Sequence, residues 1–127
     1  MCYDYGFGGV AQDFTEAARL YSLSAAQGNA VAQNNLGVMF ENGKGVAMDY
    51  AEAVRLYSLS AAQGNAPAQS NLGVMFENGR GVAQDYAEAV RLYSLAAAQG
   101  HAYAQVNLGN MFENGRGVAQ DLSLIHI

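Results

Sequence analysis

The side chains best suited to chemistry recur at a fixed spacing of 36 residues along this chain of 127 residues. In each copy an arginine lies three positions after a glutamate and three positions before a serine. A guanidinium group can bind the carboxylate of a partner through two parallel hydrogen bonds. We term this set the Arg/Ser ladder; its members are Arg19, Arg55, Arg91, Ser22, Ser58 and Ser94.

The Arg/Ser ladder allows two interpretations. In the first, it is a contact surface where the carboxylates of a partner protein or peptide meet the arginines. In the second, each arginine pairs with the glutamate three residues before it, as Arg55 does with Glu52, because residues at this spacing are neighbours on a helix surface. We favour the second interpretation, since charged helix faces are usually solvated.

A glycine-rich segment and a histidine are the other candidates for chemistry. The segment from Gly37 to Lys44 is one residue too long for a phosphate-binding loop, and Gly45 stands where Ser or Thr should bind Mg²⁺. His101 occupies the position of Asn65 in the preceding copy, so we interpret it as a helix cap. The recurring glutamates lie whole repeats apart and cannot converge on a metal ion. We therefore predict no enzyme activity, and no catalytic, cofactor-binding or metal-binding residue.

An internal repeat sets the elements that position these side chains. Three units begin at successive aspartates and cover residues 13–48, 49–84 and 85–120. The first two units differ at seven of 36 positions, and the last two differ at five. Self-similarity at a fixed period of this length is typical of solenoid proteins.

Each unit is predicted to contain two helices. The first begins with Asp-x-x-Glu, a capping box in which the aspartate caps the helix and the glutamate can reach back. Its apolar residues follow helical spacing, and a glycine ends it where a left-handed backbone is needed. In the second unit these features are carried by Asp49, Glu52, Ala53, Val54, Tyr57, Ala61 and Gly64.

The second helix is predicted to begin at Asn65 and to end at Asn78-Gly79, with Val82 fastening the following loop to the core. Its apolar face consists of Ala68, Leu72, Met75 and Phe76. Gly37, Gly73 and Gly109 fall inside such helices, where glycine costs about 1 kcal/mol relative to alanine. We expect these glycines to allow close helix packing, with the region of Ala61 and Ala62 as the neighbour.

A β-structure is disfavoured because apolar residues recur at intervals of three and four. One pair of short helices cannot bury its apolar face alone, whereas stacked pairs share a continuous core. The sequence therefore predicts an all-α fold, an α-α superhelix of about three helix-turn-helix repeats with partial repeats at both ends.

The recurring pattern resembles the Sel1-like repeat family, a relative of the tetratricopeptide repeat with a longer loop. The resemblance covers about residues 3–121. It implies a right-handed superhelix of antiparallel helix pairs, and an adaptor or scaffold role in protein complexes, often in bacteria. In the second unit the pattern is carried by Ala53, Tyr57, Ala61, Ala62, Gly64, Ala68, Gln69, Leu72, Gly73, Phe76, Gly79, Gly81, Val82 and Asp85.

The expected function is therefore protein or peptide binding. Two alternatives remain. One branch of the family is rich in cysteines and binds penicillin, which would make the chain a β-lactam hydrolase, but this sequence has no paired cysteines. The other alternative is a structural spacer between domains.

Composition excludes further classes. The six basic residues are evenly spread and the formal net charge is −5, so the concentrated basic surface of a nucleic-acid-binding protein is missing. No apolar run approaches the roughly 18 residues of a membrane span. Cys2 is the single cysteine and cannot form an internal disulfide or a cysteine zinc site, which leaves the cellular compartment open.

The two ends depart from the repeat. Residues 1–12 resemble the end of a second helix and its loop, and we interpret them as part of a preceding repeat. At residues 121–127 the pattern breaks after Asp121 into Leu-Ser-Leu-Ile-His-Ile, which is either a truncated next repeat or a tail derived from a DNA-library adapter. Without polar capping units, we expect Met111 and Phe112 to be partly uncovered, and the chain either to self-associate or to be marginally stable.

A second candidate surface consists of the positions that vary between units. Their spacing of three and four places them on one face of the second helix, which we expect to lie away from Leu72 and Phe76. Variation there could tune recognition, or it could be drift at solvent-exposed positions, which we favour. The positions are Val31, Asn34 and Val38; Pro67, Ser70 and Val74; and Tyr103, Val106 and Asn110.

Overall fold

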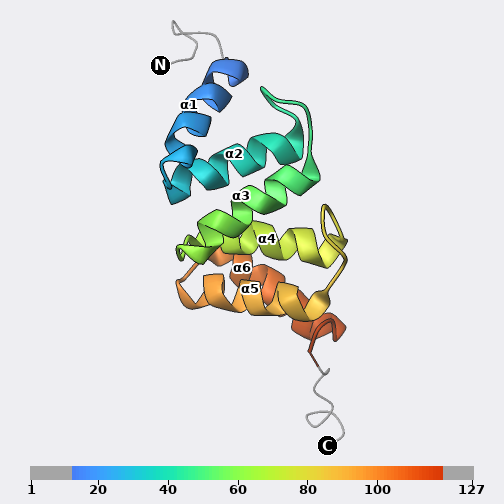
Figure 1. Ribbon diagram of the computed structural model, residues 1–127. Coiled ribbons are helices and arrows are strands. Elements are labelled where there is room, and N and C mark those ends of the chain that lie inside the picture. The colour runs from blue at the N-terminus through green and yellow to red at the C-terminus, as the bar shows by residue number, and fades with distance from the viewer. Residues whose placement is uncertain (1–12, 119–127) are drawn as a thin grey trace, which may run out of the picture.

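The computed structural model describes residues 13–118, and within this range all regular structure is helical. The helices stack in chain order as three pairs, with α1 at one end and the α5–α6 pair at the other (Figure 1). This arrangement confirms the predicted all-α solenoid. The predicted partial repeat at residues 1–12 and the tail at residues 121–127 lie outside the described residues. The helices are α1 (Phe14–Ala26), α2 (Ala30–Asn42), α3 (Tyr50–Ala62), α4 (Ala66–Asn78), α5 (Tyr86–Ala98) and α6 (Ala102–Asn114).

Aspartate begins every first helix. The side chain of Asp49 accepts a hydrogen bond of 3.0 Å from the backbone N–H of Glu52, and Asp13 and Asp85 do the same in their repeats. One expectation about this cap is wrong. The glutamate does not reach back to the cap, because its carboxylate binds the arginine three residues later.

Asparagine and glycine define the ends of the second helices. The side chain of Asn65 accepts a hydrogen bond of 2.9 Å from the backbone N–H of Ala68. His101 holds the same position before α6 but makes no capping bond through its side chain. At the other end Gly79 has a left-handed backbone with φ of 67°, which stops α4 as the sequence predicts.

The hydrophobic core is continuous across repeats. Tyr57 of α3 and Met75 of α4 are fully buried in one cluster that also contains Leu92 of the following repeat. Phe76 and Val82 pack against this cluster, which confirms the predicted role of Val82 as the loop anchor. Because each cluster draws residues from two repeats, a single helix pair could not form it.

The mid-helix glycines allow close packing, but their neighbour differs from the one expected. An added Cβ atom on Gly37 would lie 2.7 Å from the ring of Tyr57, and one on Gly73 would lie 2.6 Å from the ring of Tyr93. The neighbour is thus a tyrosine on the first helix of the following repeat, and the region of Ala61 and Ala62 is not involved. Sequence spacing identifies a close approach but does not say which helix makes it.

Each tyrosine also ties its repeat to the one before through its hydroxyl group. Tyr57 donates a hydrogen bond of 2.7 Å to a carboxylate oxygen of Glu41, and Arg80 approaches the other oxygen at 3.4 Å. The same contacts recur one repeat later, where Tyr93 donates to Glu77 at 2.7 Å and Arg116 lies 3.6 Å away. We call this unit, with its glycine, the Tyr–Gly–Glu contact.

The face that varies between repeats is only partly exposed. Asn34 and Ser70 are buried, contrary to expectation, because second helices of neighbouring repeats also touch: Asn71 donates a hydrogen bond of 3.0 Å to Asn34. Val38 and Val74 pack at the edge of the core. The exposed positions of this set are Val31, Pro67, Tyr103, Val106 and Asn110.

The far end of the array is uncovered at one of the two predicted residues. Phe112 is 52% exposed, as expected from the sequence. Met111 is only 1% exposed, so the expectation for it is wrong. The reason is that Met111 packs inward against Ala89 and Tyr93 of its own repeat.

Replacing Gly37 with alanine should destabilise the protein, whereas the same change at Gly109 should stabilise it. At Gly37 the new methyl group meets a buried ring, and overpacking of about 1–3 kcal/mol outweighs a gain in helix propensity of about 1 kcal/mol. Among the described residues nothing lies within 4 Å of an atom added at Gly109, so only the propensity gain remains. Urea unfolding of both variants measures the difference, and shifts of the same sign would contradict the Tyr–Gly–Glu contact.

The protein should lose stability as the pH rises above 10. Burial, and then the carboxylates of Glu41 and Glu77, raise the pKa of Tyr57 and of Tyr93 well above the ordinary value of 10.0. The unfolded chain therefore releases these two protons first, which lowers the free energy of unfolding by about 1.4 kcal/mol per tyrosine and pH unit. Between pH 9 and pH 11 the loss should be about 2–3 kcal/mol larger than in a Tyr57→Phe, Tyr93→Phe variant. Equal pH slopes of urea-derived stability in both proteins would contradict this expectation.

Candidate functional site

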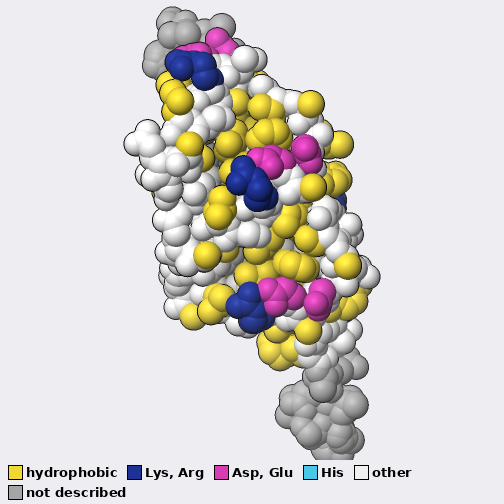
Figure 2. All heavy atoms as spheres, viewed as in Figure 1, with side chains coloured by type: hydrophobic (Ala, Val, Ile, Leu, Met, Phe, Trp, Pro, Cys, Tyr) yellow, Lys and Arg dark blue, Asp and Glu magenta, His cyan; other side chains and the backbone are white. Residues whose placement is uncertain are grey.

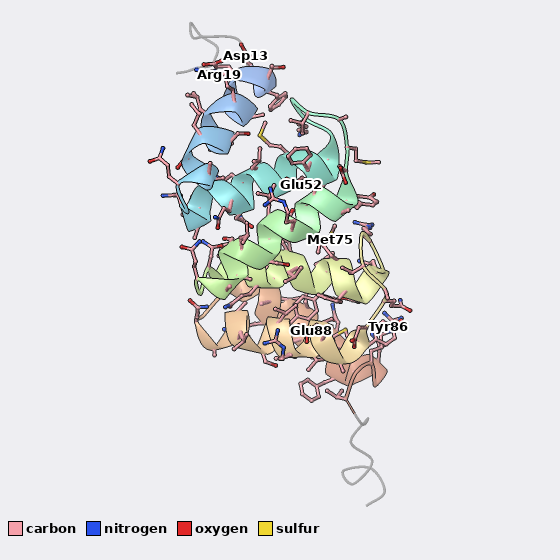
Figure 3. The ribbon with its side chains drawn as sticks, in the orientation of Figure 1. Asp13, Arg19, Glu52, Met75, Tyr86 and Glu88 are labelled. Carbon is pink, nitrogen blue, oxygen red and sulfur yellow. The ribbon has the colours of Figure 1, made fainter. Side chains whose placement is uncertain are left out.

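The Arg/Ser ladder lies on the face formed by the first helices α1, α3 and α5. Basic and acidic side chains form separate pairs in a column along this face, with hydrophobic surface between them (Figure 2). Glu52 on α3 and Glu88 on α5 point to the same side of the array (Figure 3). The 36-residue period thus becomes a straight row of equivalent positions.

Every arginine of the ladder is paired with its own glutamate. In the third repeat Arg91 donates from Nε and Nη2 to the two oxygens of Glu88, at 2.9 and 2.6 Å. The corresponding distances from Arg19 to Glu16 are 2.9 and 2.7 Å, and these bonds hold the pKa of Glu16 below its usual value. Such exposed pairs contribute little to stability. The Glu–Arg pairing favoured from the sequence is confirmed.

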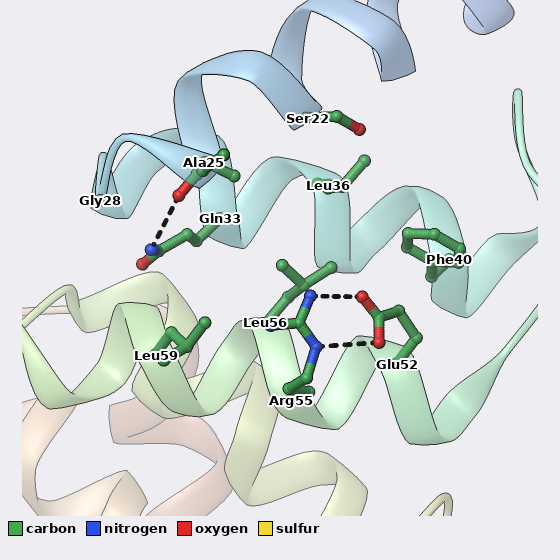
Figure 4. A pocket seen from close by; sticks show the side chains of 11 residues that line it. Ser22, Ala25, Gly28, Gln33, Leu36, Phe40, Glu52, Arg55, Leu56 and Leu59 are labelled. Atoms are coloured by element: carbon green, nitrogen blue, oxygen red, sulfur yellow. Dashed lines mark hydrogen bonds and ion pairs between the residues drawn. The ribbon is translucent and has the colours of Figure 1, made fainter.

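Between neighbouring first helices the surface is hollowed into two grooves. The first groove lies between α1 and α3 over α2 and has a volume of about 470 Å³ (Figure 4). The second lies between α3 and α5 over α4 and has a volume of about 510 Å³. Each residue that lines the first groove has a residue of the same type 36 positions later in the second. The first groove is lined by Ser22, Gln33, Leu36, Phe40, Arg55 and Leu59, among others.

The grooves offer polar and apolar surface in similar measure, without net charge. Leu59 is 43% exposed in the first groove and Leu95 is 44% exposed in the second. The Glu–Arg pair that lines each groove is neutral as a unit. Gln33 is buried, and its amide group is already engaged, because it donates to the carbonyl of Ala25 at 3.3 Å and accepts from Gln63 at 2.8 Å.

Four of the six residues of the Arg/Ser ladder line the two grooves, and the other two lie at the ends of the row. Ser22 and Arg55 line the first groove, and Ser58 and Arg91 line the second. Arg19 and Ser94 lie in neither groove. The exposed leucines were not predicted from the sequence. The sequence does contain an indication of them, because a leucine outside the apolar stripe recurs in every repeat, at Leu23, Leu59 and Leu95.

Other kinds of site find little support in the part of the chain that the structure describes. Across residues 13–118 no group of three His, Cys, Asp or Glu side chains is placed to share a metal ion. The described helices are also too short and too polar to cross a membrane.

The repeat architecture of this chain is similar to that of known proteins. The Sel1 repeat model matches residues 1–29, 30–65, 66–101 and 102–124, with the same period but counted from the second helix of each pair. A solved structure of c5321, a protective antigen of uropathogenic Escherichia coli with an SLR fold, matches with a TM-score of 0.86 and 40% identity. A Sel1 repeat protein from Oxalobacter formigenes matches with a TM-score of 0.81 and 35% identity.

These solved proteins are longer than this chain. The match to c5321 covers 91% of this chain and 25% of that protein, and the match to the Oxalobacter formigenes protein covers 89% and 46%. No curated protein sequence matches this chain. The family matches nevertheless extend over nearly the whole chain and have the period of the observed helix pairs, so this chain belongs to the Sel1 repeat family.

Proposed function

We propose that this protein is an interaction module that holds an extended segment of a partner protein along the face of α1, α3 and α5. The observation that carries this proposal is the pair of equivalent grooves, which present the same residue types one repeat apart. Membership of the Sel1 repeat family supports it, since such repeats generally mediate protein interactions.

The chemistry of the grooves favours a particular kind of segment. Leu59 and Leu95 keep apolar surface in water, which a partner could cover with apolar side chains at about 25 cal/mol per Å². Two such side chains, separated by the distance between neighbouring grooves, would bind more tightly than one because the second contact becomes intramolecular. The neutral Glu–Arg pairs imply a weak dependence of this binding on salt.

The Arg/Ser ladder would flank the bound segment. Pairing with glutamate uses one N–H of Nε and one of Nη2. Contact with the partner would use the remaining N–H groups of Nη1 and Nη2, and the serine hydroxyls would serve as further donors. The ladder then orients the segment, while the exposed leucines of the grooves supply most of the affinity.

Charged substitutions in the grooves should abolish peptide binding. A peptide selected from a random displayed library serves as the probe, and its affinity is measured by fluorescence polarisation. Leu59→Asp or Leu95→Asp should each weaken binding about ten-fold or more, because about 1.5–3 kcal/mol of apolar burial is lost. The double variant should bind no peptide. The matched control is Met48→Asp, in the loop before α3, where the side chain is 60% exposed and outside both grooves. Equal affinity of the double variant and this control would refute the proposed site.

Truncation of the ladder tests its separate role. Changing Arg19, Arg55 and Arg91 to alanine should weaken the binding of the same peptide by a smaller factor, since exposed charged contacts contribute about 1 kcal/mol or less. Arginine-to-lysine variants keep the charge and lose the planar fork, so they separate charge from geometry. Unchanged affinity in the alanine variant would remove the ladder from the binding site.

A further inference from the structure

The two end faces of the described array are the two halves of its internal interface. In the interface between the first two repeats, the ring of Tyr57 packs against Gly37. Tyr57 and Arg80 both donate hydrogen bonds to the carboxylate of Glu41. Near the other end of these helices, Gln63 donates to Gln33. The interface between the second and third repeats contains the corresponding contacts.

The α1–α2 end carries one half of these contacts. Tyr21, Gln27 and Lys44 stand at the positions that Tyr57, Gln63 and Arg80 occupy in the second repeat. Beside Tyr21 the surface has a hollow of about 310 Å³, lined by Phe14, Val38 and Met39 among others.

The α5–α6 end carries the complementary half. Gly109, Glu113 and Gln105 stand at the positions of Gly37, Glu41 and Gln33. The space above Gly109 is open among the described residues, since nothing lies within 4 Å of an added Cβ atom. Tyr103, Val106 and Phe112 expose apolar surface on the same helix. Val106 departs from the asparagine and serine of the earlier repeats and makes this face more apolar.

The grooves provide a second, independent match. At the α1 end Leu20 is 51% exposed and Leu23 is 54% exposed, whereas the residue corresponding to Leu20 in the next repeat, Leu56, is 2% exposed. Together with Glu16 and Arg19, they repeat the part of a groove that the later first helix supplies. At the α6 end, Gln105, Leu108 and Phe112 repeat the part that the second helix supplies. Joined end to end, the two halves contain every residue type of the grooves inside the chain.

We propose that copies of this chain associate head to tail, with the α5–α6 face of one copy on the α1–α2 face of the next, and that each joint completes a further groove. Tyr21 of one copy then lies on Gly109 of the other, as Tyr57 lies on Gly37. The contact joins two different surfaces, so both ends of a dimer remain able to bind, and assembly grows without closing. This association does not depend on the proposed peptide binding. Only the expectation that the groove completed at each joint also holds a peptide rests on the proposed function.

The proposal is tested by sedimentation velocity of the full 127-residue chain without any peptide. Protein concentrations from about 10 µM to 1 mM cover the dissociation constants typical of weak associations. The weight-average mass should rise continuously with concentration past that of a dimer. Gly109→Ala should weaken association about ten-fold or more, because the methyl group takes the space needed by Tyr21. The same variant should unfold at a higher temperature than the wild type in dilute solution, which shows that its fold is intact.

Two further variants make the result specific. Tyr21→Ala should also weaken association, and Met48→Ser, which changes an exposed residue outside both end faces, should leave it unchanged. A wild-type chain that remains monomeric at the highest concentration would overturn the proposal. So would a dimer that stops growing, or an association that Gly109→Ala leaves unaltered. Loss of association in Gly109→Ala and Tyr21→Ala, but not in Met48→Ser, would establish the joint.

Discussion

The Tyr–Gly–Glu contact fixes the geometry on which the rest of the structure depends. The tyrosine ring can lie this close to the second helix of the preceding repeat only because that helix has no Cβ atom at the crossing. Its hydroxyl can be buried only because it donates a hydrogen bond to a carboxylate. This contact sets the separation and rotation of one repeat relative to the next. The grooves, the row of Glu–Arg pairs and the shared core clusters all follow from its repetition.

Much of this architecture could be predicted from the sequence, and the limits have physical reasons. Caps and helix ends are local features, so Asp49, Asn65 and Gly79 were assigned correctly. Contacts between repeats are not local. Helical spacing places Gly37 on a face, but it does not specify whether the facing residue is Ala61 or Tyr57. The burial of Asn34 was missed for the same reason, because its partner Asn71 lies on a different second helix.

The candidate site combines two chemically distinct components. The charged residues that attract attention in the sequence are engaged with each other, as Arg91 is with Glu88. The apolar surface left for a partner lies between the pairs, where Leu59 and Leu95 are exposed. Sequence analysis finds the first component because charges are conspicuous. The second emerges only when separate helices form the two walls of a groove.

The near-identity of successive interfaces has a consequence for how the chain reaches its native state. Tyr93 is of the same residue type as Tyr57 at the same place in its repeat, so this contact alone does not select the correct neighbour for Gly37. The hydroxyl of Ser60 bonds to the carbonyl of Ala30 at 2.7 Å, and the corresponding residue in the next repeat is Ala96, which cannot form this bond. The buried hydroxyl of Ser60 is thus one contact that distinguishes the correct neighbour from the other.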